Sequence, residues 1–370
     1  VDVCPETGKC EVGKGNRSLT NKIRSYAALS LKRQREGHIS ALRQAAEMCA
    51  IFVLTGNGPG FYHMAGFWRR NIPWRDKLGY LDASGYRKRL GKLNPVNYRK
   101  LTQNKLSEKS ILQLLGFSTP RFLGYLHPVH GRAHNGKPLK NCNDLSRLLS
   151  SEHQDRICFK LIEGWAGRKF EVADVIRRGN KLMFRRPGDQ STVEIPDFCR
   201  TRLGDEKTGG LLIEAYLHQH PDLAAFNPSS VNTFRIWVIQ GKEGQARTVL
   251  AYLRIGRAGS LVDNQSSGGI VAPIDLETGV TACAMDGLPT RVLYPSHPDH
   301  GAPVEGRELP FWDEAKSLAE RCLVAFPNLE FAGMDIAVTG NGPVVVEINA
   351  SPDREGAAFT GMPTKRILYQ

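Results

Sequence analysis

The segment from Gly333 to Asn349 constrains the fold most, because it predicts a tight β-hairpin. Residues 333–339 and 344–349 both alternate with the period-2 pattern of a half-buried strand, and a Gly-Asn-Gly-Pro turn lies between them. A loop that folds symmetrically about Asn341 places Asp335 directly opposite Glu347, with Asn349 on the same face. The other face is then expected to hold six apolar residues: Met334, Ile336, Val338, Val344, Val346 and Ile348.

The polar face of this hairpin favours a metal site. Two carboxylates that face each other across a ladder repel unless a positive group lies between them. Asp335, Glu347 and Asn349 together offer three hard oxygen donors, which suit Mg²⁺ bound to phosphate oxygens. A solvated strand face is the alternative, but the in-phase Asn349 and the apolar opposite face favour a magnesium site.

The charge of the chain is unevenly distributed. With 370 residues, the chain is long enough for two or three packed subdomains. The net charge of +13 lies entirely in residues 1–105, which hold 20 Lys/Arg against 7 Asp/Glu, while residues 106–370 hold 30 of each. Such a basic segment is typical of contacts with nucleic acid, an anionic membrane or acidic substrates, and equally of a solvated helical surface.

The eight cysteines are scattered, without a C-x-x-C pair or a His/Cys cluster at zinc spacing. Several lie in apolar runs, where free thiols behave as small hydrophobic side chains. The longest apolar run, residues 49–54, is too short to span a bilayer, and no charged start followed by an apolar run indicates secretion. We therefore expect a reducing cytoplasm.

The N-terminal region is expected to be mostly helical. From Leu19 to Leu54 the pattern is that of a helix, which Gly37 is expected to break in two. A Gly-rich loop follows, and then a stretch to Lys92 in which aromatic rings alternate with Arg and Lys. Such a stretch can stack bases, but helices packed on a neighbouring domain are favoured here. Asn94-Pro95 marks an expected boundary.

Beyond this boundary the pattern predicts an α+β fold in two lobes. We expect helices at residues 108–115 and 312–326, and strands at residues 157–162, 211–217, 231–239 and 248–255. A Ser/Gly-rich loop is expected at residues 263–269. We expect an N-terminal region at residues 1–93, a first lobe at residues 94–210 and a second lobe at residues 211–370.

Three positively charged side chains lie in otherwise apolar predicted strands. Lys160 precedes a turn with Gly164 and Gly167, whose backbone amides could close over phosphates, although a lysine at a strand edge that reaches water is an equal alternative. Arg235 and Arg254 lie in strands with few nearby acids, where guanidinium groups bind carboxylate or phosphate. A structural Arg–Glu pair is the alternative for either arginine. Together with the hairpin, the cations indicate phosphoryl or acyl-phosphate chemistry.

Common motifs of other enzyme classes are absent. The chain has no Gly-x-x-x-x-Gly-Lys-Ser/Thr loop, no Gly-x-Gly-x-x-Gly after a strand, no His-Glu-x-x-His and no Gly-x-Ser-x-Gly. A P-loop NTPase, a Rossmann dehydrogenase, a zincin and an α/β-hydrolase are therefore not indicated.

The order of these elements resembles the ATP-grasp superfamily of carboxylate-amine ligases. Lys105 opens a helix, Lys160 precedes a glycine turn, residues 213–217 form a later strand, and Arg235, Asp335 and Glu347-x-Asn349 follow. Residues 227–235, 263–269 and 342–344 are similar to its sugar-transfer-associated, glutamate-ligase-related branch. The turn after Lys160 is poorer in glycine than the usual lid of the family, and residues 1–93 lack the α/β pre-domain that many of these ligases carry.

The resemblance implies two lobes that grip ATP, residues 94–210 with a glycine lid and residues 211–370 with the metal site. Lys105 and Lys160 would contact the phosphates under a lid from Gly164 to Lys169 that includes Gly167. Glu214 and the backbone of Ala215, Tyr216 and Leu217 would meet adenine, and Asp222 the ribose. Asp335, Glu347 and Asn349 would hold two Mg²⁺ ions. Arg235 and Arg254 would stabilise the acyl phosphate, and the loop with Asp263, Asn264, Ser267 and Gly268 would approach the acceptor.

The implied reaction is ATP-dependent ligation, in which an activated carboxylate is captured by an amine. An acidic or sugar-linked substrate at the basic N-terminal region is one further expectation. A kinase that phosphorylates a hydroxyl group on the same fold is an alternative. A protein that binds a polyanion without catalysis is another.

Overall fold

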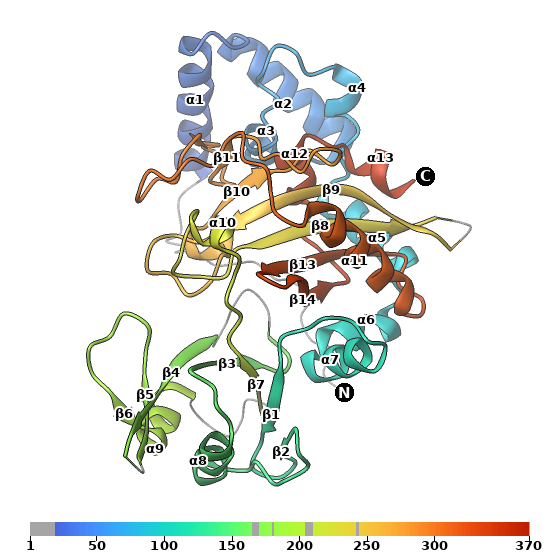
Figure 1. Ribbon diagram of the computed structural model, residues 1–370. Helices are drawn as coiled ribbons and strands as arrows, with labels where there is room; N and C mark the ends of the chain where they lie inside the picture. The colour runs from blue at the N-terminus through green and yellow to red at the C-terminus, as the bar shows by residue number, and fades with distance from the viewer. Residues whose placement is uncertain (1–18, 165–169, 180, 204–209, 242–243, 370) are drawn as a thin grey trace.

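Two antiparallel sheets divide the chain into two lobes, with helices α6 (Val96–Gln103) and α7 (Lys105–Leu114) between them (Figure 1). The structure is a computed structural model that describes residues 19–164, 170–179, 181–203, 210–241 and 244–369. Helices and strands occur together in both lobes, so the predicted mixed α+β fold is confirmed.

The sheet of the first lobe has seven strands in the order β2-β1-β7-β3-β4-β5-β6. Their bounds are β1 (Phe122–Leu126), β2 (Arg132–Ala133), β3 (Arg156–Leu161), β4 (Glu171–Arg178), β5 (Lys181–Arg185), β6 (Val193–Glu194) and β7 (Leu211–Ala215). Helices α8 (Cys142–Ser151) and α9 (Ile195–Phe198) pack on this sheet around buried Leu123, Phe159 and Phe184.

The border between the lobes differs from the predicted one at residue 210. Strand β7 lies in the middle of the first sheet, between β1 and β3, so the chain leaves this sheet only after Ala215. Helix α7 was expected in the first lobe, yet its Leu112 lies in the core of the second. Both differences arise because a glycine break or a proline marks a turn in the chain, not the sheet that the next element joins.

The sheet of the second lobe also has seven strands, in the order β12-β11-β10-β9-β8-β13-β14. Their bounds are β8 (Thr233–Gln240), β9 (Ala246–Ile255), β10 (Ile270–Pro273), β11 (Ala284–Met285), β12 (Leu293–Tyr294), β13 (Phe331–Thr339) and β14 (Gly342–Asn349). Helix α11 (Trp312–Ala325) buries Ala315, Leu318 and Cys322, spaced three and four residues apart, on one face of this sheet. The short helix α10 (Pro221–Ala224) contributes Leu223 to the same core.

The opposite face of the second sheet is covered by N-terminal and C-terminal helices. They are α2 (Ala41–Thr55), α3 (Pro59–Met64), α5 (Ala83–Leu93), α12 (Glu355–Thr360) and α13 (Thr364–Leu368). Helix α1 (Leu19–Arg35) packs on α2 and α3, and α4 (Trp74–Lys77) is joined to α2 by the Lys77–Glu47 ion pair. Tyr62, Trp68 and Tyr86 are buried in a cluster with Trp237 of β8, which confirms that the aromatic stretch packs on a neighbouring domain. The basic N-terminal region is therefore joined to the second lobe.

The predicted break at Gly37 is confirmed. This glycine adopts φ +88° between α1 and α2, and the Ser40 hydroxyl accepts a hydrogen bond from the Arg43 amide at the start of α2. Further along, Asn94 is fully buried and donates to the carbonyl oxygens of Phe331 and Ala350, each at 2.6 Å. The expected boundary at Asn94-Pro95 is thus a point of attachment to the second lobe.

Two cysteines differ from the expectation of free thiols. Cys142 and Cys199 form a disulfide that joins α8 to the residues after α9, while Cys49, Cys158, Cys283 and Cys322 are free. The spacing of 57 residues gave no sign of this pair, because only the fold of the first lobe brings them together. None of the helices in the described part of the chain has the length and apolar content that crossing a membrane requires.

Candidate active site

A row of charged side chains crosses the second sheet. Asp335 on β13 lies directly opposite Glu347 on β14 and directly opposite Arg235 on β8. Directly opposite residues share a face of a sheet, so these three side chains line one surface. The predicted pairing of Asp335 with Glu347 is confirmed.

A β-bulge in β14 produces this pairing. Next to the turn, Thr339 pairs with Gly342 and Ile336 with Val345, whereas the register shifts by one residue before Asp335. Without this shift, Val346 would face Asp335. The bulge also corrects the predicted apolar face: Val345 joins the core with Met334, Ile336, Val338 and Ile348. Val344 pairs with Ala337 on the face of Asp335, and Val346 is only half-buried.

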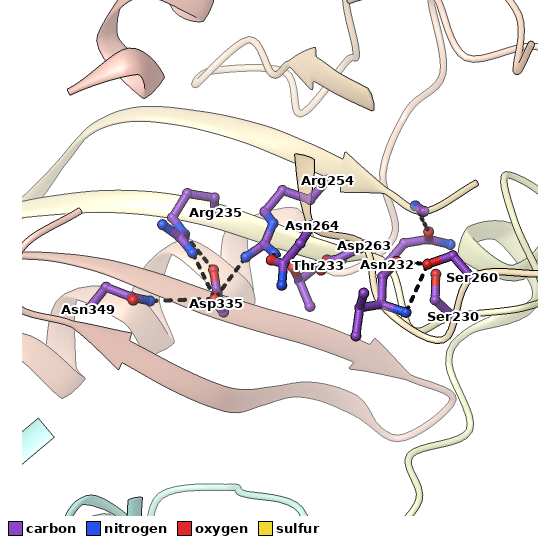
Figure 2. A network of polar contacts seen from close by, with 12 residues as sticks. Ser230, Asn232, Thr233, Arg235, Arg254, Ser260, Asp263, Asn264, Asp335 and Asn349 are labelled. Carbon is purple, nitrogen blue, oxygen red and sulfur yellow. Dashed lines mark hydrogen bonds and ion pairs between the residues drawn. The ribbon is translucent and has the colours of Figure 1, made fainter. Parts of the chain in front are cut away.

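The carboxylate of Asp335 is the centre of a buried ion-pair network (Figure 2). Both of its oxygens accept from Arg235, with Nη2 at 2.9 Å from Oδ2, and Arg254 Nη1 lies 3.0 Å from the same Oδ2. The Asn349 amide nitrogen is 3.5 Å from Oδ2. Burial alone would raise the pKa of Asp335, but the two guanidinium groups outweigh it and lower that pKa.

Arg254 connects this network to the Ser/Gly-rich loop. Its Nη2 is 2.8 Å from Asp263 Oδ1 and also donates to the side-chain oxygen of Asn264. The other oxygen of Asp263 accepts from the backbone N–H of Thr233 at 3.1 Å. The predicted acceptor loop is thus fixed at its start by an arginine of the site, and its later residues Ser267 and Gly268 are exposed.

Lys105 joins the hairpin of β13 and β14 to the first lobe. It begins α7, and its ammonium group contacts Glu347 Oε1 and lies 3.3 Å from the carbonyl oxygen of Gly164. Gly164 follows β3, so the predicted phosphate lysine, the predicted metal ligand and the start of the predicted lid come together here. Gly167 and Lys169 lie outside the described residues.

Glu214 is placed differently from the predicted contact with adenine. Its carboxylate, 1% exposed, lies between two lysines: Lys160 Nζ is 2.6 Å from Oε2, and Lys109 Nζ contacts Oε1. A carboxylate in an apolar strand is stabilised by such partners, and adenine offers no positive charge to replace them. Burial acts to lower the pKa of Lys160, but Glu214 raises it, so the lysine stays charged.

Two residues of α7 that the sequence analysis did not select also belong to the site. One is Lys109. The other is Glu108, which is 4% exposed and accepts from the backbone N–H of Ile348 at 2.9 Å. Ile348 lies between Glu347 and Asn349, so Glu108 positions the strand that carries them. Spacing of three and four residues from Lys105 on one helix was the signal that could have identified both.

The remaining predicted nucleotide contacts lie after β7. Ala215, Tyr216 and Leu217 are partly exposed at the end of this strand, and the Arg156 guanidinium lies 5.2 Å from the centre of the Tyr216 ring. Asp222 is exposed in the first turn of α10, with its Oδ2 3.6 Å from His220 Nδ1. The structure brings neither Asp222 nor the backbone of this segment into the charged row.

The donors of the hairpin fit a magnesium ion. Asp335, Glu347 and Asn349 supply two carboxylates and an amide from two paired strands, which is the oxygen-rich set that Mg²⁺ prefers. The cations Lys105, Arg235 and Arg254 hold these carboxylates, and the same cations suit the phosphate oxygens of a metal-bound nucleotide. Among the described residues, no group of three or more His, Cys, Asp or Glu side chains is arranged to hold a metal ion.

Comparisons with known proteins identify the family of the chain. The family model described as sugar-transfer associated ATP-grasp matches residues 86–369. Among solved structures, biotin carboxylase from Campylobacter jejuni is 13% identical with a TM-score of 0.42, over 75% of this chain and 47% of that one. D-alanine-D-alanine ligase from Coxiella burnetii is 11% identical with a TM-score of 0.41, over 75% and 58%. The chain thus spans about half the length of these structures. No curated protein matches significantly.

Proposed function

The chain belongs to the sugar-transfer associated ATP-grasp family, and we propose that it is an ATP- and Mg²⁺-dependent ligase that joins a carboxylate to an amine. One observation supports this most. Asp335 and Glu347 face each other on paired strands, and Lys105, Arg235 and Arg254 converge on them. A group of acids and cations on one face of a sheet is what binding a metal–phosphate complex requires.

The nucleotide would lie between the lobes. Lys105 would contact its phosphates because it is held beside Gly164, and Lys160 would do so because it lies near the end of β3, which leads into the same turn. The turn from Gly164 to Lys169, with Gly167, would close over them. The backbone of Ala215, Tyr216 and Leu217 would meet adenine, and Asp222 the ribose hydroxyls. Glu214 would act through Lys160, by holding its ammonium group in place.

Asp335, Glu347 and Asn349 would together hold two Mg²⁺ ions. The metal would neutralise charge on the phosphate oxygens while they are transferred. Arg235 and Arg254 are already fixed toward the same place by Asp335 and Asp263, so they need no reorganisation when charge develops there.

The chemistry has two steps. In the first, a carboxylate oxygen of the substrate forms a bond to the γ-phosphorus of ATP while the bond to ADP breaks. In the second, an amine nitrogen attacks the carbonyl carbon of this acyl phosphate, inorganic phosphate leaves, and the nitrogen loses a proton. Arg235 and Arg254 stabilise the anionic oxygens in both steps, and the loop with Asp263, Asn264, Ser267 and Gly268 approaches the amine.

The substrates are proposed only by class: a small-molecule carboxylate and an amine, which is an amino acid or an amino sugar. One of the substrates is proposed to be acidic or sugar-linked and to contact the basic N-terminal helices. A cytoplasmic location is also proposed, because the reaction consumes ATP.

The test measures ADP release with pooled carboxylates, pooled amines, both together, or hydroxyl compounds. The proposal expects release only when a carboxylate and an amine are both present, and a product of the summed mass with loss of water. Release with a hydroxyl acceptor alone would show a kinase instead. ATP-independent binding to a polyanion that persists in Glu347→Gln, with no turnover under any condition, would favour the non-enzymatic alternative.

A further inference from the structure

Helix α2 presents an apolar face to the outside of the molecule. Six of its exposed residues lie along one side of the helix, Leu42, Ala45, Ala46, Cys49, Phe52 and Val53, which we call the apolar face of α2; Arg43 and Leu54 are also exposed. Leu42 is 83% exposed, Val53 80% and Phe52 59%. Surface helices usually bury such residues and expose polar ones, whereas α2 buries Gln44 and Glu47 beside Ile51 and leaves these apolar residues exposed.

Buried polar contacts fix α2 in this orientation. Gln44 is fully buried and donates to the carbonyl oxygens of Ser30 at 3.2 Å and Ile39 at 2.8 Å. Glu47 faces the same side, 2.6 Å from Lys77 Nζ and 2.9 Å from the Tyr62 hydroxyl. Rotating the helix to bury its apolar face would break all of these contacts. The exposure of the apolar face therefore follows from how the helix is packed.

The surroundings of the apolar face are positively charged. Helix α1 packs beside α2 (Figure 1) and exposes Lys22, Arg24, Lys32 and Arg35. Residues 19–55 contain two acids, and both are paired with cations: Glu36 with Arg33 at 2.7 Å, and Glu47 with Lys77.

Helices α1 and α4 also expose apolar side chains among basic ones. On α1, Ile23 is 59% exposed and Leu31 47% exposed, among its basic residues. On α4, which the Lys77–Glu47 pair joins to α2, the Trp74 ring is 41% exposed beside a side chain of Arg75 that is 87% exposed. Apolar and aromatic side chains bordered by Arg and Lys are typical of surfaces that lie in the interface of a bilayer.

We propose that the apolar face of α2 docks on a membrane surface rich in anionic phospholipids. Its apolar side chains would enter the region between headgroups and acyl chains, and the basic residues of α1 with Arg43 and Arg75 would contact phosphate groups. A second copy of the chain would bring two positive surfaces together. Residues 1–18 contain only Val1, Val3 and Val12 as aliphatic side chains, too few to cover this surface.

The site between the lobes would stay accessible in this arrangement. In Figure 1, α1 and α2 lie at the end of the molecule away from the first sheet. Docking through this end leaves both lobes in solution. The proposal does not depend on the proposed reaction, because every residue it uses lies outside the charged row.

The test is sedimentation with vesicles of phosphatidylcholine alone or mixed with phosphatidylglycerol. We expect binding to the mixed vesicles that weakens as salt increases, and about tenfold or more weaker binding for Leu42→Glu/Val53→Glu. Val96→Glu is the matched control, because Val96 is 64% exposed on α6, and it should bind like the unchanged protein. Hydrogen exchange should show protection of α2 amides by mixed vesicles, without any substitution.

Two results would overturn the proposal. One is the absence of binding to the mixed vesicles together with unchanged exchange in α2. The other is a dimer in solution that Leu42→Glu/Val53→Glu converts to a monomer, since a second copy would then cover this face.

Discussion

Asp335 and Arg235 face each other on paired strands and form a two-point ion pair, in which Arg235 Nη2 lies 2.9 Å from Asp335 Oδ2. A planar guanidinium group that is held by two parallel hydrogen bonds has a fixed orientation. Because Arg254 contacts the same carboxylate from the next strand, one buried acid aligns two cations.

Replacing Arg235 by alanine should lower turnover by about 10²–10³-fold, because a fixed cation is lost where charge develops. The Kd for ATP should change little. Steady-state kinetics and ATP titration measure the two effects separately. Arg247→Ala is the control, since Arg247 is an exposed arginine on β9, the strand that pairs with the β8 strand of Arg235. A loss of ATP affinity with unchanged turnover would move Arg235 out of the reaction centre.

Lys160→Met and Lys109→Met should each destabilise the fold by about 3 kcal/mol, because each removes one of two partners of the buried Glu214 carboxylate. Only Lys160→Met should also weaken ATP binding. Denaturant unfolding and ATP titration distinguish the two lysines. Adding Glu214→Gln to Lys160→Met should recover part of the stability, and a further loss in the double variant would contradict the pairing.

Glu108→Ala should lower turnover by about tenfold, because the Ile348 amide then loses the acceptor that positions Glu347 and Asn349. Glu108→Gln keeps a side-chain oxygen at this place and should retain most of the activity. The Mg²⁺ concentration for half-maximal rate should rise in the alanine variant alone. Equal behaviour of the two variants would exclude this positioning role.

Stability should depend on pH through His63, whose ring is fully buried and stacks on Tyr26 of α1 at 5.8 Å. Burial, with help from Arg33, lowers the pKa of His63 to about 4 from its ordinary value of 6.5. The unfolded chain therefore binds a proton first as pH falls, and the free energy of unfolding should drop by up to about 3 kcal/mol between pH 6.5 and pH 4.

The control for this pH effect is the exposed His153. His63→Phe removes the titrating group and should flatten the dependence in this range, whereas His153→Gln should leave it unchanged. Urea unfolding at several pH values provides the measurement. An equally steep decline in His63→Phe would assign the effect to other groups.

The alternating pattern of the hairpin predicted the pairing of Asp335 with Glu347, although the pairing arises through a bulge that the pattern did not reveal. Alternation reports which residues share a face. It does not report an extra residue in one strand, and for this reason Val344 and Val346 were placed wrongly.

Other features depend on contacts between distant segments. Nothing local to β7 indicates that it lies between β1 and β3, or that Glu214 meets lysines from α7 and β3. The packing of the N-terminal helices on Trp237 could be inferred from their aromatic residues, but not the partner sheet. Tertiary contacts decided these positions, and single-sequence patterns carry little information about them.

The central claim is that Asp335, Glu347 and Asn349 hold the magnesium that accompanies ATP. Titration of ATP into the protein with and without Mg²⁺ tests it most directly, with Glu347→Gln beside the unchanged chain. We expect Mg²⁺ to strengthen ATP binding in the unchanged chain and to have little effect in Glu347→Gln, whose fold should persist. An equal effect of Mg²⁺ on both proteins would contradict the claim.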